Sequence, residues 1–188
     1  MSLAKAAARK AGFARRAEAH RVGAGSSSAL AGVLAGHRGK CIAGYLPIRS
    51  EIDPRPAMAA ACAHGPVCVP VIMAAGQPLR FARWTPDMAL VEGAFGAYIP
   101  AAPDWLVPGV LIVPLVAFTA QGHRLGYGGG FYDRTLERLR AERATLAIGF
   151  AYAEQEAPSL PTEPTDQPLD MIVTQDGVVT PLRAARGG

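Results

Sequence analysis

Four of the five residues from 126 to 130 are glycine, and this cluster constrains the chain more than any other feature of its sequence. Glycine loses more backbone entropy on folding than any other residue and has no side chain to pack. The cluster therefore indicates a bend where backbone N–H groups approach a ligand closely, and anions suit such amide clusters best. Arg124 precedes the bend and a basic helical segment follows it, so an anion there would meet a guanidinium and the positive end of a helix.

This glycine loop, residues 126–130, also has a plainer interpretation as a tight turn. It lacks the Gly-Lys-Ser/Thr of a Walker A motif, and it is too dense in glycine for a dinucleotide-binding fingerprint. The apolar segment before it, Arg124 beside it and the Phe-Tyr-Asp-Arg after it favour the anion site. Asp133, at the start of the following helix, has two open roles: a favourable charge for the helix dipole or a Mg²⁺ ligand.

The composition favours one folded domain over residues 1–188. Half of the residues are hydrophobic and 18% are charged, which argues against disorder. The formal net charge is +4, but residues 1–40 hold eight Lys/Arg and one acid, whereas the other 148 residues hold 11 basic and 14 acidic residues. The basic character is thus mainly N-terminal, and we expect no nucleic-acid partner.

The basic N-terminal segment is interpreted as a surface helix whose positive residues are solvated, with an organelle presequence as the alternative. No apolar stretch reaches the roughly 20 residues that a membrane span requires, so we expect no membrane partner. We also expect the protein to be cytoplasmic, in keeping with reduced thiols, and to be a monomer. The odd number of cysteines indicates buried, reduced thiols, namely Cys41, Cys62 and Cys68. His64 lies between two of them, but without a fourth ligand the spacing is a weak zinc signal.

Hydrophobic periodicity predicts alternating helices and strands. The expected helices span residues 2–22, 26–35, 55–64 and 131–143, and Ser26, Ser27 and Ser28 offer N-caps for the second. The expected strands span residues 40–46, 66–72, 79–84, 110–118, 145–151 and 171–174. Residues 85–105 are expected to form a long loop excursion.

Continuous apolar strands separated by helices predict a mainly parallel sheet covered on both faces. Ligands of such sheets bind beyond the carboxyl ends of the strands, where the glycine loop begins. Residues 45–53 follow the first strand and should emerge on the same rim, although Tyr45 could be core, and Glu51 and Asp53 could be solvated loop charges. Residues 152–168 form a second irregular segment that could close over a site.

Four sequence blocks resemble those of the 5-formyltetrahydrofolate cyclo-ligase family. The central block is Arg124-Leu125-Gly126-x-Gly128-x-Gly130-Phe131-Tyr132-Asp133-Arg134, preceded by Pro114-x-x-Ala117-Phe118. The others are the N-terminal pair Lys5 and Arg9, the segment Tyr45-x-Pro47 with Glu51-Ile52-Asp53, and the C-terminal Asp166-x-x-x-Asp170-x-Ile172-Val173-Thr174. The blocks occur in the family's order and span nearly the whole chain.

The resemblance implies a three-layer α/β fold with a mainly parallel sheet and helices on both faces, of the NagB/RpiA/CoA transferase-like type. It also implies ATP- and Mg²⁺-dependent closure of a ring on 5-formyltetrahydrofolate. The γ-phosphate is transferred to the N5-formyl oxygen, N10 attacks, and phosphate leaves to give 5,10-methenyltetrahydrofolate and ADP. Positioning and charge neutralisation dominate such phosphoryl transfers.

By the same resemblance, Glu51, Arg124 and Tyr132 are expected to be catalytic, Tyr45, Glu51 and Tyr132 to line the folate pocket, and Asp133 to bind the metal. Lys5 and Arg9 lie one helical turn apart and could reach the nucleotide phosphates from one face. The remaining nucleotide-binding residues implied are Arg124, Leu125, Gly126, Tyr127, Gly128, Gly129, Gly130, Phe131, Tyr132 and Asp133.

The chain departs from the family pattern at three places. Thr119 stands where members commonly have Asp, Tyr127 and Gly129 stand where many carry Arg or Lys, and Thr165 replaces a frequent His. Arg134 or Arg138 could supply the missing positive charge. Two alternatives stay open: a weak or inactive folate- or nucleotide-binding relative, and a phosphosugar isomerase on a related fold.

Overall fold

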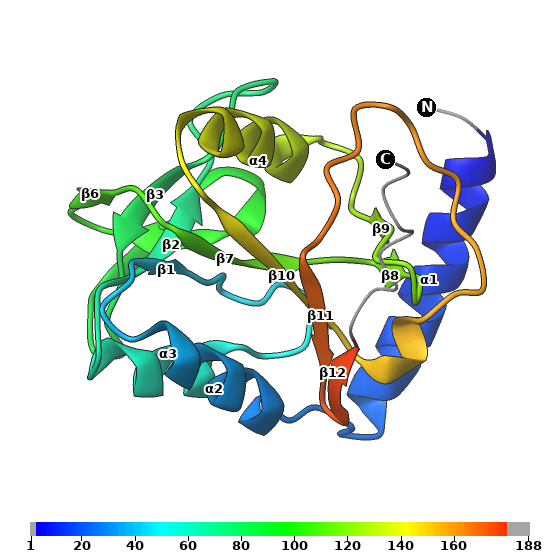
Figure 1. The fold of residues 1–188 in the computed structure, drawn as a ribbon, viewed down its shortest axis with the longest axis horizontal. Helices are drawn as coiled ribbons and strands as arrows, with labels where there is room; N and C mark the ends of the chain where they lie inside the picture. The colour runs from blue at the N-terminus through cyan, green and yellow to red at the C-terminus, as the bar shows by residue number, and fades with distance from the viewer. Residues whose placement is uncertain (1–2, 180–188) are drawn as a thin grey trace, which may run out of the picture.

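A computed structural model describes residues 3–179 of the chain (Figure 1). Its α-helices are α1 (Leu3–Arg21), α2 (Ser28–Leu34), α3 (Arg55–Cys62) and α4 (Phe131–Glu142), with short 3₁₀ turns η1 (Ala35–His37), η2 (Ala94–Gly96) and η3 (Ala153–Gln155). Its strands are β1 (Ile42–Ala43), β2 (Val67–Val71), β3 (Arg80–Arg83), β4 (Leu90–Glu92), β5 (Tyr98–Pro100), β6 (Trp105–Leu106), β7 (Val110–Pro114), β8 (Ala117–Phe118), β9 (Arg124–Leu125), β10 (Leu146–Phe150), β11 (Met171–Thr174) and β12 (Gly177–Val179).

The central sheet is mainly parallel, as predicted. Its strand order is β12-β11-β10-β7-β1-β2-β3-β6. The five strands from β11 to β2 pair in parallel, whereas β12, β3 and β6 pair antiparallel at the two edges. The carboxyl ends of β1, β7 and β10 therefore share one rim, and the segments that follow these strands meet there.

The three-layer α/β prediction is confirmed. Alternate residues of each strand face opposite sides of the sheet, so Val110 and Ile112 join one core cluster and Leu111 and Val113 the other. The first cluster includes Leu30 and Leu34 of α2 and Ala57, Met58 and Ala61 of α3; the second includes Leu136 and Leu139 of α4. Figure 1 shows α2 and α3 on one face of the sheet and α4 on the other.

Helix α1 lies outside these three layers, beyond the rim where β8 and β9 form a small separate ladder (Figure 1). It packs on β8 and on η3. Gly12 makes this approach possible, because a Cβ there would lie 2.8 Å from both Cγ1 and the carbonyl oxygen of Val116. No helix in residues 3–179 has both the length and the apolarity needed to cross a membrane.

Several predicted boundaries are wrong. The strand expected over 110–118 ends at Pro114, after which Gln155 Nε2 donates to the carbonyl oxygens of Leu115 and Val116 and the chain leaves the main sheet. The excursion over 85–105 contains the β4–β5 hairpin and ends at Trp105, the first of the two residues of β6. Strand β1 has two residues instead of seven, and β12 was not anticipated. Of the three serines expected to offer N-caps, Ser28 is the first residue of α2 and its amide donates to Ser26 Oγ at 3.3 Å, while Ser27 at the N-cap makes no side-chain cap bond.

The docking of α1 gives a stability prediction. Gly12→Ala gains up to about 1 kcal/mol of helix propensity, but the new methyl group meets a backbone carbonyl that cannot rotate away, and such overpacking costs about 1–3 kcal/mol. We therefore expect a net loss in the free energy of unfolding, measured by urea denaturation. Gly32→Ala, in α2 with nothing within 4 Å of the added Cβ, is the control and should stabilise by about 0.5–1 kcal/mol. Equal responses of the two variants would contradict the tight contact at Gly12.

Candidate active site

The glycine loop connects β9 to α4 on the rim of the sheet. Gly128 and Gly130 have φ angles of +105° and +65°, a region that favours glycine. Within residues 3–179, the amides from Tyr127 to Gly130 donate to no hydrogen-bond acceptor. Gly130 is the N-cap of α4 and supplies no side-chain bond to its first turn. The bend thus presents a row of N–H groups and the positive end of a 12-residue helix.

The residues that flank the loop differ in what they offer. Leu125 is 2% exposed in β9, and Phe131 packs against the second core cluster, so their side chains belong to the core. Gly126 has open space at its Cβ position, whereas a Cβ at Gly129 would lie 2.9 Å from the Phe131 ring. Only two of the four glycines are therefore required by a left-handed backbone.

Arg124 and Asp133 form an ion pair beneath the loop. Arg124 Nη2 donates to Asp133 Oδ1 at 2.7 Å, and the amide of Gln167 donates to the same oxygen at 2.9 Å. Burial lowers the pKa of Arg124 although Asp133 opposes this shift. Both residues lie next to the loop, and in this structure the guanidinium is directed at the carboxylate.

The N-terminal helix brings cations to the same place, and the interpretation of its positive residues as solvated is wrong for two of them. Lys5 is 6% exposed and Arg16 1% exposed, because both lie on the face of α1 that packs on the rim. Arg9 Nε donates to the Gly126 carbonyl oxygen at 2.8 Å. The signal was present in the sequence, since residues 5, 9, 12 and 16 follow the i, i+4, i+7, i+11 spacing of one helical face.

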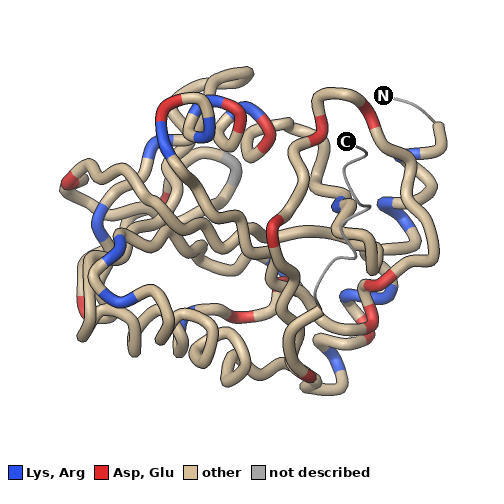
Figure 2. The backbone as a smooth tube through the Cα atoms, in the orientation of Figure 1, with Lys and Arg blue, Asp and Glu red and all other residues tan. Residues whose placement is uncertain are grey.

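The segment over 152–168, which was expected to be irregular and able to close over a site, contacts α1 through Lys5 and α4 through Asp133. Lys5 Nζ lies 3.0 Å from Asp166 Oδ2 and 3.1 Å from Glu163 Oε2. Burial lowers the pKa of Lys5, but the bonds to the two carboxylates outweigh it and the net direction is upward. Figure 2 shows the acidic residues of this segment running beside the basic residues of α1.

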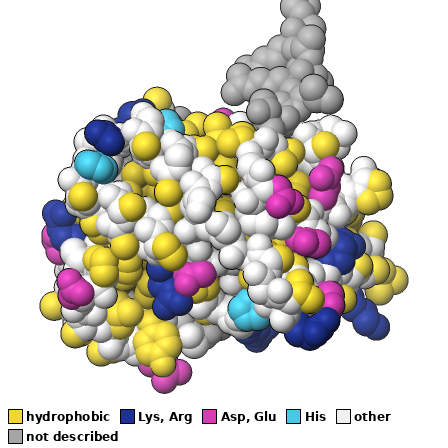
Figure 3. All heavy atoms as spheres, turned by 90° about the horizontal axis from the view of Figure 1, so that it is seen from below, with side chains coloured by type: hydrophobic (Ala, Val, Ile, Leu, Met, Phe, Trp, Pro, Cys, Tyr) yellow, Lys and Arg dark blue, Asp and Glu magenta, His cyan; other side chains and the backbone are white. Residues whose placement is uncertain are grey.

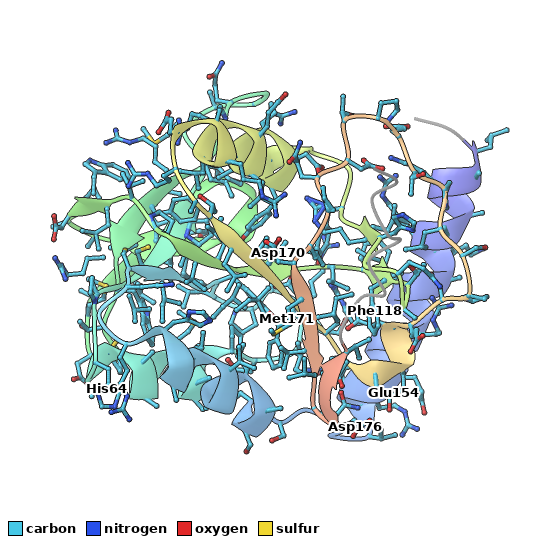
Figure 4. All side chains as sticks on the ribbon, in the orientation of Figure 1. His64, Phe118, Glu154, Asp170, Met171 and Asp176 are labelled. Carbon is cyan, nitrogen blue, oxygen red and sulfur yellow. The ribbon has the colours of Figure 1, made fainter. Side chains whose placement is uncertain are left out.

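Asp170, in the C-terminal block, is a structural anchor. Its Oδ2 accepts from the amide of Ala147 at 2.8 Å and from Arg140 Nη2 at 2.9 Å. Figure 4 labels it at the start of β11, beside β10. It ties the end of the irregular segment to the sheet and to α4, which fixes where Asp166 and Gln167 lie.

Glu51 lies in the segment that follows β1 and is 6% exposed. Its Oε2 accepts from the amide of Ile48 at 2.9 Å. Burial raises the pKa of the carboxyl group, while this bond and the nearby Arg16 oppose the shift. Tyr45, which precedes it, is 3% exposed and donates to the carbonyl oxygen of Ile52 at 2.8 Å, so it belongs to the first core cluster and braces this segment. Asp53 pairs with Arg55 on the surface, 2.7 Å away.

Tyr127 connects the glycine loop to Glu51. Its hydroxyl donates to Glu51 Oε1 at 3.0 Å. Its ring lies 5.3 Å from that of Phe13, and the Arg16 guanidinium lies over both rings at 5.2–5.3 Å. Many family members carry a cation at the position of Tyr127. Here the position holds an aromatic residue whose ring contacts the Arg16 guanidinium. Sequence reasoning missed Phe13 and Arg16 entirely.

Tyr132 contributes a buried polar atom without a partner. Its hydroxyl makes no hydrogen bond within the described residues. Burial, with Glu51 as a second cause, raises its pKa far above the ordinary value, so the group is a neutral phenol that can donate. A buried donor without an acceptor is costly, and such groups are found where a ligand completes the bonding.

The residues around Asp133 fit a metal ion only in part. Within residues 3–179, no group of three or more His, Cys, Asp or Glu side chains is arranged to hold a metal. Asp133 Oδ1 accepts both recorded bonds, which leaves Oδ2 for another partner. The carboxylate could therefore be one ligand of a cation whose other ligands are phosphate oxygens and water, a common arrangement for Mg²⁺.

The cysteines are free, but only Cys68 is fully buried, whereas Cys41 and Cys62 are half-buried. The face of the molecule in Figure 3 carries Lys/Arg and Asp/Glu side chains interspersed with hydrophobic ones.

Comparison with known proteins agrees with these features. A model of the 5-formyltetrahydrofolate cyclo-ligase family matches residues 7–175. A 5-formyltetrahydrofolate cyclo-ligase of Haemophilus influenzae is 41% identical over 101 residues, 50% of this chain and 54% of the relative, so the chain spans about half the length of that protein. One of Mycolicibacterium smegmatis is 31% identical over 182 residues, 90% of this chain and 92% of the relative.

The solved structure of Aquifex aeolicus 5,10-methenyltetrahydrofolate synthetase superposes with a TM-score of 0.76 at 28% identity, covering 99% of this chain and 96% of that one. A synthetase of Mycoplasma pneumoniae, 23% identical with a TM-score of 0.61, shares the fold. The family model, the alignment with the Mycolicibacterium smegmatis relative and the shared fold all identify the same family. The contact between the glycine loop and a buried glutamate agrees with them. The chain belongs to the 5-formyltetrahydrofolate cyclo-ligase family.

Proposed function

We propose that this protein catalyses the ATP-dependent cyclisation of 5-formyltetrahydrofolate to 5,10-methenyltetrahydrofolate, with release of ADP and phosphate. The observation that carries the proposal is the 3.0 Å contact between Tyr127 of the glycine loop and Glu51. This contact brings the glycine loop, which we propose as the phosphate-binding bend, and a buried carboxylate together on one rim. A reaction that moves a phosphoryl group onto a folate needs both within reach of one another.

In the proposed enzyme, the nucleotide phosphates bind the amides from Tyr127 to Gly130 and the N-terminus of α4. Lys5 and Arg9 add positive charge from α1. Arg134 is a further cation, since its Nη2 donates to the Gly129 carbonyl oxygen and its guanidinium lies 5.5 Å from the Phe131 ring. Arg134 thereby takes the place of the Lys or Arg that many relatives carry inside the loop.

The folate lies on the opposite side of Tyr127, against Glu51 and Tyr132. The Glu51 carboxylate accepts hydrogen bonds from the N–H groups of the reduced pterin. The Tyr132 hydroxyl, which has no acceptor in residues 3–179, donates to a polar atom of the substrate. Tyr45 supports this wall from the core and would offer the edge of its ring to the pterin.

The chemistry requires charge neutralisation more than proton transfer. The N5-formyl oxygen attacks the terminal phosphorus and the bond to ADP breaks. N10 then attacks the activated formyl carbon and loses its proton to solvent, and the C–O bond to phosphate breaks as the ring closes. Arg124 turns its guanidinium from Asp133 towards the transferred group and stabilises its charge. Asp133 would hold Mg²⁺ in part, and the ion would supply neutralisation of the phosphate charge.

A binding protein without turnover is the second candidate. Thr119, at a position where relatives commonly have Asp, is 1% exposed and its hydroxyl makes no hydrogen bond within the described residues. A substrate-binding protein that has lost one polar group would retain affinity for folate and ATP.

A direct assay separates these candidates. Protein mixed with ATP, Mg²⁺ and 5-formyltetrahydrofolate should produce the absorbance of the methenyl product. Removal of Mg²⁺ by EDTA should stop the reaction, and excess Mg²⁺ should restore it. Tight binding of both ligands by calorimetry without any product would overturn the enzyme proposal in favour of the binding protein.

Two arginines on α4 allow a controlled test of the nucleotide site, with Arg134 as the tested residue and Arg138 as the control. Arg134→Ala should raise the KM for ATP roughly tenfold, equivalent to about 1.4 kcal/mol, because it removes the cation beside the loop. Arg138 contacts the Leu79 carbonyl oxygen at 3.4 Å, away from the loop, so Arg138→Ala should leave the KM for ATP unchanged. Steady-state kinetics at saturating folate measures both, and equal effects would argue against a role for Arg134 in binding phosphate.

A further inference from the structure

Arg16 is one of the most deeply buried charged side chains in residues 3–179, at 1% exposure. It projects from α1 into the junction between the glycine loop and the segment after β1. Its Nε donates to Ser50 Oγ at 3.1 Å, and its guanidinium is packed over the rings of Phe13 and Tyr127. A buried guanidinium is expensive unless hydrogen-bonded or paired, so this placement calls for an explanation.

The nearest negative charge is Glu51. Arg16 Nη1 lies 3.8 Å from Glu51 Oε1, the same oxygen that accepts the hydrogen bond from Tyr127. Arg16 Nη1 has no hydrogen-bond acceptor within the described residues. The contact is thus an ion pair without a hydrogen bond, and it acts on Glu51 by charge.

Glu51 is surrounded by groups from four elements. Tyr127 of the glycine loop donates to it, Tyr132 of α4 has its pKa raised by it, and Tyr45 and Arg49 of its own segment also interact with it electrostatically. Burial raises the pKa of Glu51, and Arg16 and Arg49 are the two cations that oppose this. Arg49 belongs to the same segment as Glu51. Arg16, in contrast, comes from α1 and is buried together with the carboxylate.

We propose that Arg16 is a positioning residue that keeps the Glu51 carboxylate ionised and oriented beside Tyr127, ready to accept hydrogen bonds from the reduced pterin ring. The inference rests on the proposed role of Glu51 in binding folate. Arg16 does not touch the substrate; its enclosure by Phe13 and Tyr127 holds the charge in place while leaving the carboxylate free to accept further bonds. The aromatic residue in the glycine loop of this chain is part of that enclosure.

A purely structural role is the competing explanation, in which Arg16 simply fastens α1 to Ser50. The two explanations differ in two predictions: how kcat/KM for folate depends on pH, and whether the effect of Arg16 depends on the presence of Glu51. Loss of a purely structural Arg16 would lower the free energy of unfolding and would change the KM values of both substrates alike. A residue that acts through Glu51 changes folate binding specifically, and loses its effect once the glutamate charge is gone.

The experiment compares Arg16→Met, Glu51→Gln and the double variant, with Arg15→Met on the same helix as the control. Arg16→Met should raise the KM for 5-formyltetrahydrofolate roughly tenfold, within the range for contacting charges, while the KM for ATP changes little. The acid limb of kcat/KM for folate should move to higher pH, because the buried carboxylate then lacks its cation. Arg16→Lys keeps a positive charge beside Glu51, so its acid limb should lie close to that of the unsubstituted protein. In the Glu51→Gln background, Arg16→Met should have no further effect on the folate KM.

The outcomes separate cleanly. An unchanged acid limb in folded Arg16→Met, or additive effects in the double variant, would overturn the role of Arg16. If Glu51→Gln leaves the folate KM unchanged, the proposed role of Glu51 fails and the inference falls with it. Should Arg16→Met not fold, Ser50→Ala tests the same point, because it removes the bond that orients the guanidinium; an unchanged folate KM and acid limb in folded Ser50→Ala would also overturn it.

Discussion

The burial of cations on one face of α1 is the constraint on which the rest of the site depends. Charged groups removed from water need partners, and each of these cations finds its partner on a different segment. Lys5 contacts Asp166, Arg9 contacts the Gly126 carbonyl oxygen, and Arg16 contacts Ser50 and Glu51. Gly12, in the middle of the same face, lets the helix approach the Val116 carbonyl closely enough for all of these contacts to form.

This arrangement means that the site is assembled from four segments, of which only the glycine loop is a recognisable ligand-binding motif. The parallel sheet places the ends of β1, β7 and β10 on one rim, but the segments after them are irregular. Ion pairs to α1 and the Tyr127–Glu51 hydrogen bond hold them together. Two ion pairs at the site, Arg124–Asp133 and Lys5–Asp166, involve the same groups that the proposed nucleotide and metal ion would engage. In the proposed enzyme, ligand binding therefore exchanges internal ion pairs of these cations for contacts with phosphate.

Much of the fold follows from patterns within short stretches of the chain. The continuous apolar strands, the alanine-rich helices and the glycine cluster each appear near their expected places, because the periodicity of burial is a local property. The errors are local too. Pro114 ended a strand whose apolar pattern continued to 118, and the hairpin β4–β5 lies in an excursion whose Pro and Gly content suggested a loop. The site was anticipated as a set of residues on one rim, and the structure brings Glu51, Arg124, Tyr127, Tyr132 and Asp133 into that region.

The amino-acid order alone was enough to specify the bend at Gly128 and Gly130, the alternation of helix and strand, and a family resemblance spread over four blocks. It could not reveal which charges are buried. The bond between Tyr127 and Glu51 joins residues 76 positions apart, and that between Lys5 and Asp166 joins residues 161 apart. Contacts of this kind arise when separately formed elements pack, since burial and pairing depend on the whole surroundings of a side chain. The sequence predicted a basic helix at the N-terminus. The burial of Arg16 was decided by the tertiary packing of α1 on the rim.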